Sequence, residues 1–211
     1  MSIIKVDIIS DPICPWCYIG KKRFEQALSS NYANNIEVSW RSFQLNPNLP
    51  VDGIKRLDYL EGKFGSIKAA DSIFANIYEV GVKNNIEFAF DSIKKTPNTI
   101  NAHRLIGWSS LYDLQDKVVT KLFESYFENG QDIGCLNILF NIATSCGLPK
   151  NDVVKFLESD KGYNNVLSEC NAASKMGITG VPFFILNGEY YISGAQDPEV
   201  FIKAFNSLKS K

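Results

Sequence analysis

The chain has 211 residues, of which 45% are hydrophobic and 21% are charged, an ordinary balance for a soluble globular protein. A chain of this length buries about 70% of the surface that its unfolded form exposes, so its core needs no disulfide bonds. Its 22 basic and 23 acidic residues give a net charge of −1, which excludes the bulk electrostatics of a nucleic-acid or anionic-membrane binder. No long apolar run occurs, so no transmembrane helix is predicted.

The first segment, residues 3–9, alternates apolar and polar side chains and predicts a strand that ends at residues 10–12. Lys5 and Asp7 interrupt this run, whereas a secretory signal needs a continuous apolar stretch after a basic start. The five cysteines are an odd number in a chain that needs no covalent staples, which argues against a disulfide framework. We therefore expect a cytoplasmic protein.

A C-x-x-C motif at residues 14–17 follows this strand and opens a helical run whose apolar stripe includes Phe24 and Leu28. Residues 36–43 alternate again and predict a second strand. The order strand, helix, strand favours a parallel β-α-β unit.

The middle of the chain has a different character. Apolar residues between about 54 and 176 recur at helical spacing, and we expect helices there without any pair of strands. Gly177 follows the block and fits a left-handed cap at the end of its last helix.

The end of the chain returns to strand patterns. Residues 181–186 and 189–192 flank Asn187-Gly188, a pair typical of a tight hairpin because both central positions of its turn need positive φ. Pro198, preceded by a capping aspartate, suits the first position of a last helix.

These elements predict an α/β protein with the order β-α-β, a large helical insertion and then β-β-α. Residues 1–52 and 177–211 would form one domain with a single mixed sheet, and residues 53–176 would be an inserted helical domain. The two parts must pack together because neither can close a core alone.

The C-x-x-C motif carries the chemistry. Pro15 suits the first helical position, which places Cys14 at the helix start, where free N–H groups and the helix dipole favour a thiolate. Cys17 lies one turn along, within reach of a disulfide with Cys14. Cys14 is therefore predicted to attack a substrate disulfide, and Cys17 to resolve the mixed disulfide that forms.

The alternative for this motif is half of a zinc site, which usually needs a second close pair of ligands. The chain has a single histidine, His103, and Cys135, Cys146 and Cys170 form no such pair. We therefore predict no metal site, no second redox pair, and simple burial for these three cysteines.

The motif and several local stretches resemble one family. Residues 14–17 after a strand, Gly180-Val181-Pro182-Phe183-Phe184 before the last hairpin, and the insertion between them resemble the DsbA-like branch of the thioredoxin superfamily. Within it the chain is similar to the FrnE-type dithiol–disulfide isomerases, through residues 10–21, 40–47, 101–105 and 192–196. The resemblance covers most of the chain and implies a thioredoxin-like fold.

The resemblance also implies site residues. It makes Pro182 a cis-proline that faces the two cysteines and leaves the backbone of Val181 free to pair with an extended substrate. Pro15, Trp16 and Val181 would contact substrate. His103 would lie near the cleft, where its imidazolium would help to hold the Cys14 thiolate, or it would be a packed or helix-surface residue next to Arg104.

Trp16, Ile13 and Phe183 would form an apolar rim for unfolded or extended polypeptide, or any of them would simply be part of the core. The run Lys21-Lys22-Arg23 is predicted to be a solvated face. Asp11 is predicted to be a turn or cap residue before Pro12.

Three functions remain open at this point. The first is a thiol–disulfide oxidoreductase or isomerase with no bound cofactor, which works through a redox-active Cys14–Cys17 disulfide on protein substrates. Glutathione or a thioredoxin system would supply its electrons. The second is a glutathione-dependent enzyme like the kappa-class transferases and hydroxychromene-carboxylate isomerases, which share the architecture but typically carry serine at the position of Cys14. The third is a non-enzymatic chaperone. The substrate, the reduction potential and the oligomeric state are not predicted.

Overall fold

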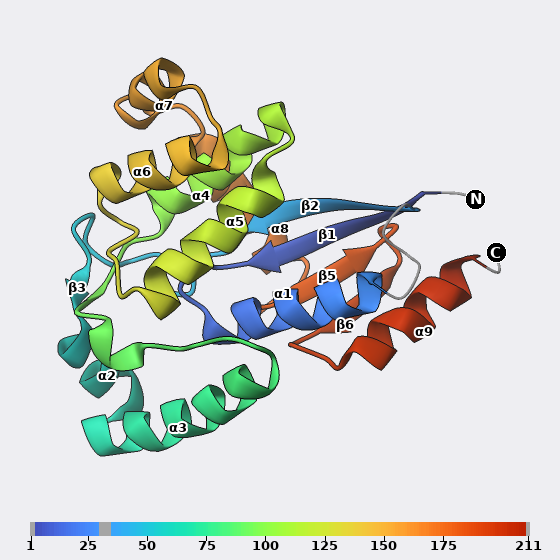
Figure 1. Cartoon of the computed structure of the whole chain (residues 1–211), viewed down its shortest axis with the longest axis horizontal. Helices are drawn as coiled ribbons and strands as arrows, with labels where there is room; N and C mark the ends of the chain where they lie inside the picture. Colours follow the sequence, from blue (N-terminus) through green and yellow to red (C-terminus); the bar gives the residue numbers. More distant parts are fainter. Residues whose placement is uncertain (1–2, 30–34, 210–211) are drawn as a thin grey trace.

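A computed structural model describes residues 3–29 and 35–209. Its main sheet has the strand order β2-β1-β5-β6, in which β1 and β2 are parallel and the other neighbours antiparallel (Figure 1). The predicted mixed sheet is thereby confirmed. The strands are β1 (Ile4–Ser10), β2 (Ile36–Ser42), β5 (Phe183–Leu186) and β6 (Tyr190–Ser193).

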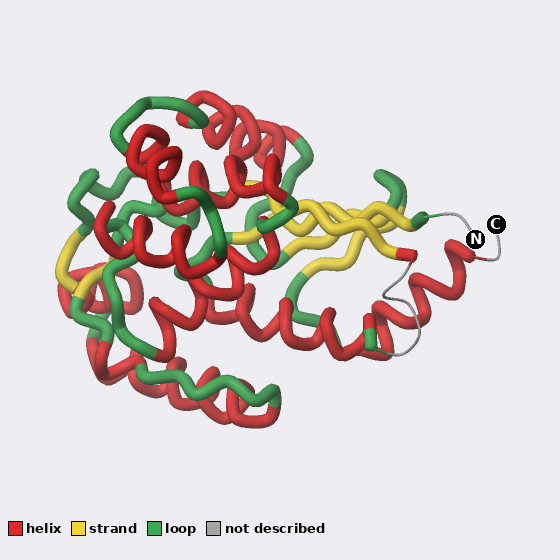
Figure 2. Tube along the Cα trace, turned by 45° about the horizontal axis from the view of Figure 1, so that its top comes forward, coloured by secondary structure: helices red, strands yellow, loops and turns green. Residues whose placement is uncertain are grey.

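The two faces of this sheet bury different side chains. Ile8 and Phe184 share one core with residues of α1 (Pro15–Leu28) and α9 (Pro198–Lys209), which lie together on that face. Ile9 and Ile185 point to the other face and pack against α8 (Tyr163–Lys175). The alternation of each strand therefore produces a helix–sheet–helix sandwich (Figure 2).

The insertion lies at the end of the sheet where β1 and β2 finish (Figure 1). It is helical as predicted, but it also contains a short antiparallel pair of strands that was not expected. This pair joins Ile54 to Thr96 and Lys55 to Lys95, and two residues per strand are too few to produce a readable alternation. The elements are β3 (Ile54–Lys55), α2 (Arg56–Phe64), α3 (Ile67–Lys83), β4 (Lys95–Thr96), α4 (Ile100–Ser109), α5 (Gln115–Phe123), α6 (Leu136–Cys146) and α7 (Lys150–Leu157). None of the helices in the described part of the chain is long and apolar enough to span a membrane.

One continuous core joins the insertion to the sheet. Tyr18 of α1 stacks on Phe123 of α5 with ring centroids 4.9 Å apart, and it meets Phe88 edge-on at 6.1 Å. Its hydroxyl donates to Glu128 Oε1 at 2.6 Å, just beyond α5. Aromatic ring pairs stabilise a protein beyond the apolar area that they bury. These contacts of Tyr18 therefore hold the start of α1 against the insertion.

The predicted hairpin turn has the expected backbone. Asn187 and Gly188 both have positive φ, +51° and +73°, as a type I′ turn requires. Gly177, with φ +77°, directly follows the last residue of the α8 cap, Met176. Both turn predictions from the glycine positions agree with the structure.

Lys21 does not belong to a solvated face, and this expectation was wrong. Its side chain is 1% exposed, and its ammonium pairs with Glu25 of the same helix and with Asp116 of α5 at 3.0 Å. The ammonium also lies 5.7 Å from the centre of the Trp40 ring. Because the insertion covers this side of α1, the stem of Lys21 is buried while its two carboxylate partners stay partly exposed.

Lys21 generates a stability prediction. Replacing Lys21 by Met should change the free energy of unfolding by less than about 1 kcal/mol, because it removes a buried charge and leaves two carboxylates that water can reach. The double variant Glu25→Gln/Asp116→Asn should cost about 3 kcal/mol, because the ammonium then stays buried without a counter-charge. Urea unfolding of both variants measures this, and equal losses would contradict it.

Helix α1 packs closely against the loop before β5 at Gly20. A Cβ atom on Gly20 would lie 2.8 Å from Cγ of Pro182, which is too short for two carbon atoms. We expect Gly20→Ala to destabilise the protein by about 1–2 kcal/mol, because overpacking outweighs the gain in helix propensity. The matched control is Gly62→Ala in α2, where a Cβ meets nothing within 4 Å. It should stabilise the protein by about 0.5–1 kcal/mol in the same urea titration.

Candidate functional site

The C-x-x-C motif lies where β1 passes into α1. Cys14 has extended backbone angles, φ −94° and ψ +113°, and is the N-cap of α1, with Pro15 at the first helical position. Its carbonyl accepts from the N–H groups of Cys17 at 3.0 Å and Tyr18 at 3.3 Å. The proline therefore starts the helix where no N–H is needed, and Cys14 sits at the positive end of the helix dipole.

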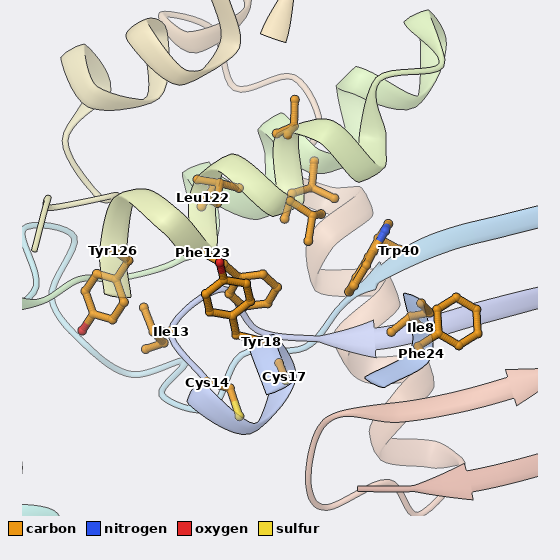
Figure 3. Close-up of a cluster of buried hydrophobic side chains, with 14 of the residues drawn as sticks. Ile8, Ile13, Cys14, Cys17, Tyr18, Phe24, Trp40, Leu122, Phe123 and Tyr126 are labelled. Carbon is orange, nitrogen blue, oxygen red and sulfur yellow. The ribbon is translucent and has the colours of Figure 1, made fainter. Parts of the chain in front are cut away.

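Both cysteines are free thiols, so the structure describes the reduced form (Figure 3). Both are buried, Cys14 at 5% exposed and Cys17 at 1%, so Cys14 is the slightly more exposed of the two. Its thiol donates to the carbonyl oxygen of Val181 at 3.5 Å, a contact between residues 167 positions apart in the chain.

Cys17 is held in its protonated form. Burial raises the pKa of its thiol well above the ordinary value, and the neighbouring Cys14 raises it further. Hydrogen bonds from the Ser10 side chain and the Asp11 backbone act in the opposite direction but are weaker. Cys17 must therefore lose a proton before it can act as a nucleophile.

The loop before β5 faces Cys14 directly. The Val181–Pro182 peptide bond is cis, Pro182 is buried and Val181 is half-buried. The Val181 carbonyl that accepts from Cys14 is a backbone group of the kind that an extended polypeptide uses when it adds to a sheet edge. The structure therefore brings together the predicted residues Cys14, Cys17, Val181 and Pro182.

The apolar rim is smaller than predicted. Trp16 is 36% exposed, and Phe183 is half-buried with its ring 6.1 Å from that of Tyr191. Ile13, in contrast, is buried beside Tyr126 in the shared core, so it is part of the core and not of the rim (Figure 3). Ile13 turns inward because the insertion packs over the loop that precedes Cys14.

His103 lies on α4, buried beneath the loop that leads to Cys14. Its Nε2 is 3.1 Å from the carbonyl oxygen of Phe43 and 3.7 Å from Oδ1 of Asp11, and neither contact involves a cysteine sulfur. Asp11 is fully buried and accepts from the N–H groups of Ile13 at 3.4 Å and Leu45 at 2.7 Å. The bond from Ile13 agrees with the predicted turn role of Asp11. The bond from Leu45 and the contact with His103 connect the motif loop to the segment after β2 and to α4.

The remaining cysteines are free thiols. Cys146 is buried as expected, whereas Cys170 is only half-buried. Their thiols donate to backbone carbonyls of Lys117 and Ser42 at 3.7 and 3.6 Å, and burial raises the pKa of both. Cys135 is exposed at the N-cap of α6, so the expectation that it is buried was wrong. Within residues 3–29 and 35–209, no group of three histidine, cysteine or acidic side chains is arranged to hold a metal ion.

Three residues of this site were not singled out from the sequence. Tyr18 and Gly20 lie on the first turns of α1, where they meet Phe123 and Pro182. Ser10 lies near Cys17 and acts to lower the pKa of its thiol. A glycine inside a helix just after the motif is the one signal that could have indicated a close approach.

The comparisons with known proteins agree with this geometry. Residues 5–206 match the family model of the DSBA-like thioredoxin domain. The uncharacterized protein YwbO of Bacillus subtilis is 28% identical over 99% of this chain and 98% of its own length. The crystal structure of the probable DsbA oxidoreductase SCO1869 from Streptomyces coelicolor superposes with a TM-score of 0.89 at 28% identity, covering 99% of this chain and 91% of that one.

A more distant structure shares the fold alone. The cytosolic disulfide reductase DsbM from Pseudomonas aeruginosa, solved with GSH, has a TM-score of 0.69 at 12% identity, covering 98% of this chain and all of that one.

The family model spans the Cys14–Cys17 helix, the whole insertion and the Pro182 loop. The chain therefore belongs to the DSBA-like thioredoxin domain family of oxidoreductases.

Proposed function

We propose that this protein is a thiol–disulfide oxidoreductase that reduces or isomerises disulfides of protein substrates through Cys14 and Cys17. The observation that carries the proposal is the arrangement of the two sulfurs. Cys14 caps a helix and touches the carbonyl before Pro182, whereas Cys17 lies protonated behind it. One sulfur is placed to meet a substrate, and the other to act after the substrate is attached.

The reaction then follows in two exchanges. The Cys14 thiolate attacks a substrate disulfide, forms the Cys14–substrate bond and releases one substrate thiolate. Cys17 loses its proton and attacks Cys14, which releases the second substrate thiolate and leaves the Cys14–Cys17 disulfide. The substrate gains two electrons and the protein loses two. A thiol reductant, for which we propose glutathione or a thioredoxin system, returns the pair to the dithiol form.

Substrate contact is proposed for the residues around Cys14. Trp16 and Pro15 form the outer side of the first turn, and Trp16 offers an exposed apolar surface to an extended chain. The Val181 carbonyl would exchange its bond from the Cys14 thiol for one from a substrate N–H once that thiol is consumed. This would draw the peptide across Pro182.

The glutathione-dependent isomerase or transferase remains the second candidate, because its enzymes share this architecture. Those enzymes typically have serine in place of Cys14 and need no resolving thiol. A buried Cys17 held one turn behind Cys14 has no use in such a reaction. The residues therefore favour disulfide exchange.

Equilibration in glutathione redox buffers, with thiol trapping of Cys14 and Cys17, tests the proposal. We expect one reversible two-electron transition, accompanied by a change in the fluorescence of Trp16, which lies between the two cysteines. A potential near about −270 mV would indicate a reductase, and one between about −180 and −120 mV an oxidant or isomerase. Two thiols that stay reduced across all buffers would exclude the proposed function.

Single cysteine variants separate the two candidates. Cys17→Ser should accumulate a stable mixed disulfide between Cys14 and a peptide substrate, because nothing resolves it, and steady-state disulfide reduction should fall by at least about 100-fold. Mass spectrometry of the adduct measures this, with Cys14→Ser as the control that forms none. A Cys17→Ser variant with full activity on a small electrophile and glutathione would instead support the second candidate.

A further inference from the structure

A cavity of about 520 Å³ lies between β2, α4 and α8. Cys14, Trp16, Cys17, Val181 and Pro182 all belong to the described part of the chain, and the cavity lining includes none of them. The proposed disulfide exchange therefore makes no use of this cavity. Pockets for small molecules usually have volumes of about 300–1,000 Å³, so its size suits a small ligand.

Aromatic side chains form part of the cavity wall. Trp40 and Phe156 are buried, and the half-buried Trp108 stacks on Phe156 with ring centroids 4.6 Å apart. The backbone N–H of Trp40 donates to Gln115 at 2.8 Å, and its indole N–H donates to Asp116 at 3.1 Å. Because these contacts already hold the two indole rings in place, a flat apolar ligand could bind them without ordering the wall first.

Two cations line the same cavity. Arg104 of α4 is 5% exposed, and Lys161 lies in the loop before α8. Nε of Arg104 donates to the Lys161 carbonyl at 2.7 Å, so the two residues are adjacent. Within residues 3–29 and 35–209, no carboxylate lies within 4 Å of either side chain, and Asp160 acts on Arg104 only from a longer distance. Two neighbouring positive charges therefore lack a close counter-charge.

The hydrogen bonds of Arg104 do not supply that counter-charge. Its guanidinium donates to the backbone carbonyls of Phe156, Ser159 and Lys161 and to the side-chain oxygen of Asn101. All four acceptors are neutral, so they hold the group in place without cancelling its charge. They use four of its five N–H groups, and the fifth, on Nη1, has no acceptor among the described residues.

The start of α8 adds to the positive potential. Gly162 is the N-cap of this 13-residue helix and also lines the cavity. A glycine has no side chain that could accept from the free N–H groups of the first turn, and this helix start has no side-chain cap. The helix dipole therefore acts on the cavity with the same sign as Arg104 and Lys161.

Glu169 is the only acidic side chain among the described residues that line the cavity, and its partners lie within the protein. It accepts from the N–H and hydroxyl groups of Ser42 at 2.8 and 2.6 Å, and it pairs with Arg41 at 3.4 Å. Arg41 also pairs with Asp7. The charges on this side of the cavity thus neutralise one another, whereas those of α4 and the start of α8 do not. A singly charged anion would also be repelled less by Glu169 than a phosphate would.

We propose that this cavity binds a small aromatic carboxylate. The rings of Trp40 and Trp108 contact its flat apolar body, and Arg104, Lys161 and the free N–H groups at the start of α8 attract its carboxylate. The site is separate from the cysteines, so the proposal does not rest on the function proposed above.

Isothermal titration calorimetry of the full chain tests the ligand class, with 2-naphthoate as the probe. The control ligand is 2-naphthamide, which has the same shape without the charge. We expect naphthoate to bind at least about 10-fold more tightly than naphthamide at low ionic strength, and added salt to reduce this difference.

Nuclear magnetic resonance locates the probe, because the chain has three tryptophans and two of them line the cavity. The indole N–H signals of Trp40 and Trp108 should shift when naphthoate binds. The signal of Trp16, beside the cysteines, should stay in place.

A cavity-filling variant tests the position of the site. Gly107 of α4 lines the cavity, and a Cβ atom there meets nothing within 4 Å, so Gly107→Leu places a side chain in open space. It should weaken naphthoate binding at least about 10-fold. The matched control is Gly62→Leu in α2, which also has open space but lies outside the lining, and its affinity should stay within about 2-fold of wild type. Lys161→Met should weaken naphthoate at least about 3-fold and naphthamide less than about 2-fold.

The outcomes keep this site and the redox function apart. Disulfide reduction by Gly107→Leu should stay within about 2-fold of wild type, and a larger loss would overturn the separation of the two sites. An absence of saturable naphthoate binding at about 1 mM, or a shift of the Trp16 signal alone, would overturn the proposal. Equal affinity for naphthoate and naphthamide, or unaltered binding in Gly107→Leu, would do the same. Failure of the Cys14–Cys17 couple in redox buffers would remove the proposed function and leave this site standing.

Discussion

The contact between the start of α1 and the loop before β5 is the constraint on which the rest of the structure depends. Two segments more than 160 residues apart meet there, with Cys14 Sγ 3.5 Å from the Val181 oxygen. Gly20 allows α1 to lie against Pro182, since any side chain would collide with the ring. One close packing contact thus places the helix that carries the cysteines against the loop that faces them. The pairing of β5 with β1 sets the register of the strand that follows this loop.

Contacts with the insertion also hold the start of α1 in place. Tyr18, directly after Cys17, is enclosed by aromatic rings of the insertion and bonded to Glu128. Lys21, one turn along, reaches Asp116 of α5. Because these contacts fall on the first two turns of α1, the insertion holds the redox motif itself. The same burial explains why Cys17 keeps its proton, since desolvation disfavours the charged thiolate.

The sequence allowed much of this to be predicted where local rules apply. Alternation placed β1 and β2, Asn187-Gly188 placed the hairpin, and Cys14-Pro15 placed the helix start, because each depends on neighbouring residues. The failures involve contacts between distant segments. Lys21 and the β3–β4 pair depend on how the insertion folds back onto the sheet, which no periodicity of the chain records.

The residues of the site also separate into those that local sequence predicts and those that depend on distant contacts. Cys14 and Cys17 could be recognised by spacing, and Pro182 by a family resemblance, but the surroundings of His103 could not. The sequence left His103 either near the cleft or packed within the protein, and in the structure it is packed behind the motif against Asp11 and Phe43. The structure thus places His103 where it holds the loop before Cys14 in position, through Asp11 and Phe43, and not where it would contact either sulfur. The proposed substrate contacts lie elsewhere, where Trp16 is exposed and the Val181 carbonyl meets Cys14. The residues that position the motif are therefore separate from those proposed to meet a substrate.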